Sequence, residues 1–217
     1  MKLKFLSRLL LISSLGLFLA SCQKEVDFQN EGGPGPGPGQ GTNFTPDITG
    51  SWKFVGLSAD TRVDITVTES GQNLKAVTTS SYSSDNNTGT LTVTSNQFIY
   101  SGISATVEGE QNVKTYLNGI LFDDQTMPYN SAIPSTDLTS DYVRNSNDSL
   151  TFTNALLTIP DPNGGTTAPA PTGARISLTG DTLTVVTKSI ASTTITQNGV
   201  PGLFDARIDG IMKFTRQ

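Results

Sequence analysis

The 217-residue chain contains no histidine and only one cysteine, Cys22. Without histidine, Ser-His and Cys-His nucleophilic mechanisms and imidazole metal sites are excluded. A single cysteine cannot form a disulfide within the chain, so an apolar core has to stabilise the fold. Basic residues number 14 against 19 acidic ones, and this balance argues against nucleic acid as a partner.

Long apolar runs are also scarce. Leu9–Phe18 is almost wholly apolar, but it is shorter than the roughly 20 residues that a transmembrane helix needs. Three basic residues precede this run, and small residues follow it up to Cys22. These three zones are typical of an export signal, so we expect residues 1–21 to be a signal peptide that is removed, which leaves a more acidic chain.

Leu19-Ala20-Ser21-Cys22 resembles the lipobox of bacterial lipoproteins at all four positions. In that family the cysteine thiol is diacylated, the chain is cut before it, and the new amino group is acylated. The resemblance implies a membrane anchor on Cys22, which is nearly irreversible because each buried methylene contributes about 0.8 kcal/mol. The alternative is an ordinary secretory signal with an incidental cysteine.

The residues after Cys22 bear on the destination of the anchor. Gln23 stands where lipoproteins retained in the inner membrane usually carry aspartate, so the resemblance implies the outer membrane. The charged cluster Lys24–Asp27 is similar to the export tag of surface lipoproteins of anaerobic Gram-negative gut bacteria. This likeness implies exposure at the cell surface, with a periplasm-facing orientation as the alternative.

Residues 22–47 are predicted to form a lipidated tether. Gly32–Gly41 consists almost entirely of glycine and proline, which favour neither helix nor strand. From Cys22 to Phe44 the chain would reach roughly 26 Å as a flexible coil and about 70 Å when extended. The remaining residues, 48–217, are numerous enough for one domain with its own core.

Apolar residues in this domain recur every second position, the spacing of strands with one buried face. Val63, Ile65 and Val67 alternate with polar residues, and no sustained helical stripe follows the signal. Gly180-Asp181 is a two-residue turn signal that predicts a tight hairpin. Residues 123–145 and 160–173 are predicted to be long loops. Strands are predicted near 51–57, 62–68, 73–81, 88–94, 97–107, 112–122, 149–158, 174–179, 182–190, 192–197 and 206–216.

Many short antiparallel strands have to hide their edges by closing into a barrel or by stacking two sheets. Gly50-Ser51-Trp52 opens the first predicted strand, and Arg216 ends the last one. This pattern resembles the lipocalins and related calycins, in which a basic residue packs over the tryptophan of a Gly-x-Trp motif. The resemblance implies an antiparallel, lipocalin-like up-and-down barrel of about eight to ten strands, with Lys213 as a second choice of partner. An immunoglobulin-like or other β-sandwich is the alternative fold.

A lipocalin-like barrel implies a cavity for a small lipophilic ligand, with the 123–145 loop over its mouth. The alternative is that the same aromatic side chains simply fill the core. The candidate lining residues are Phe54, Phe98, Tyr100, Tyr116, Phe152 and Phe214.

Carboxylates are the remaining candidates for chemistry. Asp123-Asp124, Asp137 and Asp141 are predicted to crowd one loop, where they would act as a glycosidase-like pair, bind calcium weakly or solvate the loop. Asp161–Gly164 resembles a calcium-binding loop, but a turn that contains proline explains the same residues. We expect no catalytic residue, no metal and no cofactor, and therefore no enzyme.

Two short segments, at Ser149 and Thr182, resemble the Asp-Ser/Thr-apolar sequon for periplasmic O-glycosylation in gut bacteria, although capping of strand turns explains them equally. Three functions remain open: a tethered protein that binds a small apolar ligand, a surface module that binds glycans or an outer-membrane protein, and a carboxylate-dependent hydrolase. The surface module predicts exposed aromatics, and Tyr129 and Tyr142 are the candidates on the predicted loops.

Cys22→Ala is expected to release the protein from the membrane, because the acyl chains would have no attachment site. Fractionation of cells into membrane and soluble material measures this, with Ser21→Ala, which keeps a small residue before the cysteine, as the control. A Cys22→Ala variant that still sediments with membranes would contradict the lipid anchor.

Overall fold

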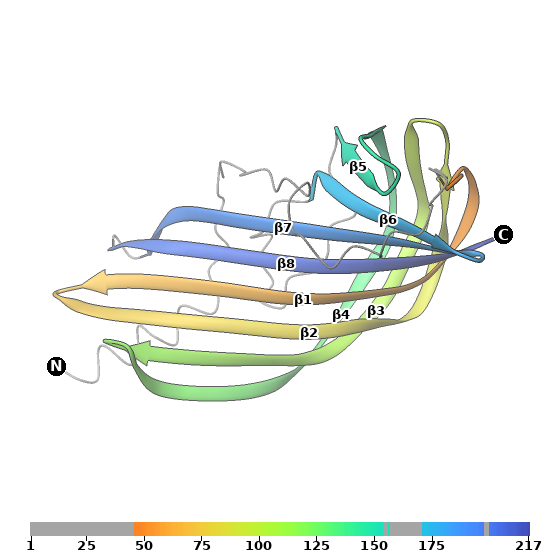
Figure 1. The fold of residues 1–217 in the computed structure, drawn as a ribbon. Coiled ribbons are helices and arrows are strands. Elements are labelled where there is room, and N and C mark those ends of the chain that lie inside the picture. The colour runs from red at the N-terminus through yellow and green to blue at the C-terminus, as the bar shows by residue number, and fades with distance from the viewer. Residues whose placement is uncertain (1–45, 154–155, 157–170, 198–199) are drawn as a thin grey trace, which may run out of the picture.

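The computed structural model describes residues 46–153, 156, 171–197 and 200–217. Eight antiparallel strands follow one another around a single closed barrel, in which the first strand also pairs with the last (Figure 1). The predicted up-and-down barrel is therefore confirmed over the sandwich. Among the described residues, no helix is long and apolar enough to cross a membrane. The strands are β1 (Gly50–Glu69), β2 (Gln72–Val93), β3 (Gln97–Leu117), β4 (Ile120–Arg144), β5 (Ser149–Phe152), β6 (Gly173–Thr179), β7 (Thr182–Gln197) and β8 (Val200–Arg216).

Several predicted short strands are halves of longer ones. β1 contains both 51–57 and 62–68, and β2 and β7 each join two predicted segments in the same way. The predicted strand 112–122 is wrong at its end, because it crosses the turn Asn118-Gly119 that separates β3 from β4. Pairing with both neighbours continues through the polar stretches that suggested loops, and bulges absorb the irregularities. The hairpin at Gly180-Asp181 is confirmed, since Thr179 pairs with Thr182 across it.

The predicted loop over residues 123–145 is wrong, because this segment lies in β4. It pairs with β3 along most of its length, from Leu117–Ile120 to Gln97–Asp141. Most side chains between 120 and 132 are exposed. A strand whose side chains are mostly exposed does not need apolar residues at every second position. For this reason the segment has the polar composition of a loop. Most of the other predicted loop, 160–173, lies outside the described residues, and its last residue, Gly173, begins β6.

The strands differ greatly in length, and this determines the shape of the barrel (Figure 1). β5 has 4 residues and β6 has 7, whereas β1 to β4 have 20 to 25. The short strands complete the ring only beside the start of β1, which we call the closed end. At the other end, the open end, Ile120–Pro128 of β4 and Ile190–Thr196 of β7 each pair with a single strand among the described residues.

The main apolar core lies at the closed end. A second, smaller cluster lies on β1, β7 and β8 toward the open end, where Phe204 and Ile195 are its largest buried members. The fully buried large side chains of the main core are Ile48, Trp52, Phe54, Leu91, Phe98, Tyr100, Ile103, Leu150, Phe152, Leu156, Leu183 and Phe214.

A β-bulge at Gly102 reverses which residues of β3 face inward. Gly102 has φ 61°, and the register with β4 shifts between Tyr100 and Ile103. Before the bulge the even-numbered Phe98 and Tyr100 are buried, and after it the odd-numbered Ile103 is buried. An extra residue in one strand has this effect because side chains alternate with a period of two.

Gly109 allows Tyr82 of the neighbouring strand to lie against β3. A Cβ at Gly109 would lie 2.2 Å from the backbone oxygen of Ser81 and 2.7 Å from the Cα of Tyr82. The Tyr82 ring instead packs against the Tyr129 ring, with 5.6 Å between ring centroids. An aromatic residue beside a glycine in the next strand is a known means of holding sheet register.

Gly109→Ala is expected to lower the free energy of unfolding by about 1–3 kcal/mol, because backbone would have to move away from the added methyl group. Gly56→Ala is the matched control, since no atom lies within 4 Å of its added Cβ, and its effect should stay below about 1 kcal/mol. Denaturant unfolding measures both variants. Equal effects of the two substitutions would contradict the close approach at Gly109.

Candidate functional site at the open end

Trp52, the only tryptophan, lies fully buried at the closed end beneath Arg216. The guanidinium carbon of Arg216 is 4.6 Å from the centroid of the indole, and the two residues are paired across β1 and β8. An added Cβ at Gly50 would lie 3.8 Å from Arg216 Nη1. The three motif residues therefore meet at one place, while Lys213 lies exposed elsewhere on β8.

The segment that leads into β1, Pro46–Thr49, is fastened across the closed end. Trp52 Nε1 donates to the Ile48 backbone oxygen at 2.9 Å, and Arg216 Nη2 donates to that of Asp47 at 3.2 Å. Both terminal nitrogens of Arg144 donate to the Pro46 oxygen at 3.1 Å. Arg144 was not identified from the sequence, because its partner is 98 residues away.

Asp47 belongs to the same segment and is a local turn residue rather than a reactive acid. Its side chain accepts hydrogen bonds from the hydroxyl and the backbone N–H of Thr49, at 2.7 and 2.9 Å. These two bonds, the hydroxyl bond foremost, lower the pKa of Asp47.

Five of the six candidate cavity residues form the packed core of the closed end. Phe98 contacts Phe152 at 5.2 Å between centroids, and Phe54 contacts Phe214 at 5.5 Å. Tyr100 lies among them with a hydroxyl that has no hydrogen-bond partner, and burial raises its pKa. Each of these five rings is 2% exposed or less, so the space beneath Trp52 is occupied by aromatic side chains.

The sixth candidate, Tyr116, does not line the interior. It is half-buried on the outward face of β3, in register with Lys75 and Leu121. The bulge at Gly102 is the reason, because it places odd-numbered residues of β3 inside from Ile103 onward.

The four aspartates predicted to share a loop are spread along β4, and each has its own partner. Asp137 accepts a hydrogen bond from the Gly102 N–H, and Asp141 accepts one from the Gln97 side chain, both at 2.7 Å. No group of three or more acidic or cysteine residues that could hold a metal ion occurs among the described residues. These contacts give Asp137 and Asp141 structural roles.

The two aromatics expected on loops are both in β4. Tyr129 is half-buried against Tyr82, and Tyr142 is buried against Phe98, with its hydroxyl donating to the Thr94 oxygen at 2.9 Å. Burial raises the pKa of Tyr142. Neither tyrosine is an exposed recognition residue.

The remaining sequence candidates divide between the sheet and the part of the chain outside the described residues. Ser149 begins β5 and Thr182 begins β7, and both are half-buried. Cys22 and Asp161–Gly164 lie outside the described residues, so what the sequence indicates for them stays a prediction.

Three of the four most exposed large apolar residues of the described chain lie together at the start of β4. Ile120, Leu121 and Phe122 are 74%, 49% and 59% exposed and follow the tight turn Asn118-Gly119. The register between β3 and β4 shifts at this point and leaves Phe122 without an opposite residue, as in a bulge. We call Ile120–Met127 the β4 tip.

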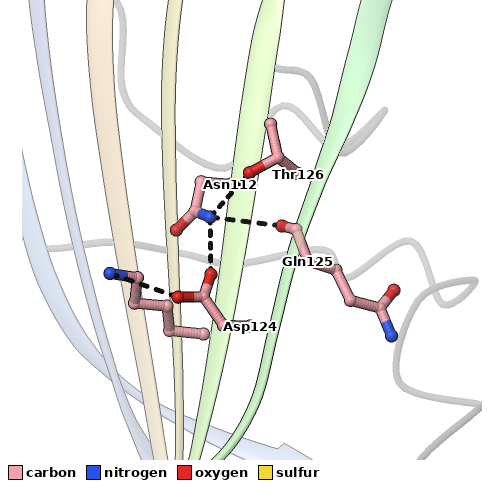
Figure 2. A network of polar contacts seen from close by, with 5 residues as sticks. Asn112, Asp124, Gln125 and Thr126 are labelled. Carbon is pink, nitrogen blue, oxygen red and sulfur yellow. Dashed lines mark hydrogen bonds and ion pairs between the residues drawn. The ribbon is translucent and has the colours of Figure 1, made fainter.

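The β4 tip is braced from two sides. At the turn, Asn118 N–H donates to the Asn73 oxygen at 2.8 Å, and Asn118 Oδ1 accepts from the Asn73 N–H at 2.9 Å. Further along, the Asn112 side-chain nitrogen donates to Asp124 Oδ1 at 2.7 Å and Thr126 Oγ1 at 3.0 Å, with a longer contact to the Gln125 oxygen (Figure 2). A lysine, Lys114, lies 3.5 Å from the other oxygen of Asp124.

The β4 tip is the candidate functional site that sequence reasoning missed. An exposed run of three large apolar residues on a braced hairpin is an expected contact surface. The run stands directly after Asn-Gly in the sequence, and that turn signal could have placed it at a hairpin tip.

Comparison with known proteins adds little. No family model and no curated protein matches the chain. A solved structure, the attachment invasion locus protein Ail of Yersinia pestis, aligns with 76% of this chain and 99% of its own, at 9% identity and a TM-score of 0.18. A likeness this small does not establish a shared fold or function.

Arg216→Ala is expected to lower the free energy of unfolding by about 1 kcal/mol, through loss of the contact with Trp52 and of the bond to Asp47. It should also shift the fluorescence of Trp52. Lys213→Ala, an exposed position of the same strand, should change stability by less than about 0.5 kcal/mol. Unaltered fluorescence and stability in Arg216→Ala would contradict the described closed end.

Proposed function

We propose that the protein is a non-catalytic binding module, anchored in the bacterial outer membrane through Cys22 and exposed at the cell surface, which contacts another protein through the β4 tip. The observation that carries this proposal is the exposure of Ile120, Leu121 and Phe122 on a braced hairpin. Exposed side chains of this size contribute nothing to the core, so their presence calls for a partner.

The position of the tip supports the proposal. The predicted tether, residues 22–47, leads into β1 at the closed end, while the β3–β4 turn lies at the open end (Figure 1). A straight strand of the length of β1 spans about 60 Å. The tip is therefore at the end of the barrel remote from the tether, which favours contact with a partner over contact with the anchoring membrane.

Ion pairs on the outward face of the barrel favour a domain that is surrounded by water and held to the membrane by its tether. Asp64 on β1 lies 2.8 Å from Arg62 and 2.7 Å from Lys75, and Arg207 pairs with Asp209 on β8. A barrel embedded in lipid needs an apolar outward band. An ionic row on these strands therefore fits anchorage through Cys22 better than insertion of the strands.

A protein partner is favoured over a lipid surface by the charges near the tip. Asp123 and Asp124 follow Phe122 directly. The nearby Lys114 is paired with Asp124, and Lys75 with Asp64. Surface-seeking segments combine apolar side chains with basic ones that meet lipid phosphates, and the β4 tip has the opposite sign.

A small lipophilic ligand remains a second candidate function. The buried Tyr100 hydroxyl has no hydrogen-bond partner, and a ligand with one polar group would supply it. The rings of Phe98 and Phe214 contact Tyr100 and fill the space that a ligand would need. We therefore favour the β4 tip as the main site.

Phe122→Ser is expected to abolish partner binding while changing the free energy of unfolding by less than about 0.5 kcal/mol, because the side chain is mostly exposed. A photo-reactive residue at Thr126 should form an adduct with a protein in intact cells. The same residue at Gln72, exposed on the neighbouring β1–β2 hairpin, should form none.

Three results would contradict the proposed function. The first is the absence of an adduct at Thr126, and the second is an adduct there that survives Phe122→Ser. The third is binding of the wild-type chain, but not Phe122→Ser, to vesicles of phosphatidylethanolamine and phosphatidylglycerol, which would make the tip a lipid contact.

A further inference from the structure

We infer that the β4 tip takes its partner by strand addition, and that the partner segment is an extended strand with two adjacent basic residues between apolar ones. The inference rests on the proposed function and adds the mode of binding and the chemistry of the partner.

Among the described residues, the backbone of the β4 tip is paired on one side only. Ile120 to Met127 pair with Leu117 to Gln111 of β3, and no described strand lies on the other side. Such an edge presents backbone N–H and C=O groups that an added strand can bind. Pro128 follows and lacks an N–H group, so Ile120–Met127 is the stretch of this edge before the first residue without a backbone donor.

The side chains along this edge form a simple pattern. Apolar residues stand at both ends, Ile120–Phe122 and Met127, and the acidic pair Asp123-Asp124 stands between them. Thr115 opposes Asp123 and Lys114 opposes Asp124, so the two carboxylates lie on opposite faces of the sheet. Two adjacent basic residues of a partner strand would meet both carboxylates, one on each face.

A second copy of the chain is a poor occupant of this edge. An antiparallel, two-fold pairing of two β4 tips would bring Asp123-Asp124 of both copies together at its centre. The stretch of β7 that pairs with β8 alone, Lys188–Gln197, has one basic residue, Lys188 at its start, and so lacks the adjacent basic pair that would match both carboxylates. The charges therefore point to a different protein.

The edge is held ready for an added strand. Asn112 fixes Asp124, Gln125 and Thr126 from the β3 side, as Figure 2 shows. Asp124 is still 40% exposed and so is able to meet a basic group. Because these atoms are already positioned, an incoming strand would order little more than itself.

The test uses the full chain and a labelled octapeptide, acetyl-Val-Val-Thr-Lys-Lys-Thr-Val-Val-amide, with fluorescence anisotropy. We expect saturable binding that is at least tenfold weaker for the peptide with two glutamates in place of the lysines, and weaker as salt rises. Asp123→Asn together with Asp124→Asn should weaken binding similarly, whereas Asp85→Asn together with Asp181→Asn should not. Equal binding of the lysine and glutamate peptides, or no binding, would overturn the inference.

Backbone pairing is tested without altering the protein. Two further peptides carry N-methyl groups at alternate residues, one set at odd and one at even positions. Strand addition predicts loss of binding for one set only, because alternate N–H groups of a strand point to the same side. Unchanged binding of both sets would overturn strand addition. It would leave the proposed function standing, which fails instead if the adduct at Thr126 is absent or insensitive to Phe122→Ser.

Discussion

The burial of Trp52 at the closed end is the interaction on which the rest of the structure depends. Its indole donates to the segment that leads into β1 and lies beneath the Arg216 guanidinium, so it joins the start of the first strand to the end of the last. The aromatic core packs directly behind it. Closure of the sheet is achieved here with only 4 and 7 residues in β5 and β6.

Most apolar burial is concentrated at the closed end, so the strands at the open end do not need to bury a large apolar core. Buried polar residues such as Thr61, Ser80 and Thr187 separate the main core from the smaller cluster around Phe204. On the β3–β4 side, cross-strand polar contacts such as those of Asn112 hold the strands together. This division lets the β4 tip expose apolar side chains without loss of core packing, since a braced hairpin keeps its shape without them.

The fold class could be predicted from two features of the sequence. The period of two residues marks burial of one face within each strand, and the Gly-x-Trp motif with Arg216 marks the contact that joins the first strand to the last. The polar segment 123–145 could not be recognised as a strand, since its pairing with β3 depends on the partner and not on its own composition. Tyr116 could not be placed, because its face depends on the Gly102 bulge, which the alternation on either side does not reveal. The β4 tip was missed for a related reason: an apolar triplet reads as core until its neighbours are known to leave it exposed.

Hydrogen–deuterium exchange of backbone amides in the free full-length chain tests the central claim, that the barrel is closed and packed at one end and open along β4 at the other. Slow exchange, close to the limit of global unfolding, is expected for Phe54 and Phe98–Tyr100, and fast exchange for about half of the amides in Ile120–Met127, those on the free edge. Uniformly slow exchange along β4 would contradict it, because every amide of the tip would then already have a partner.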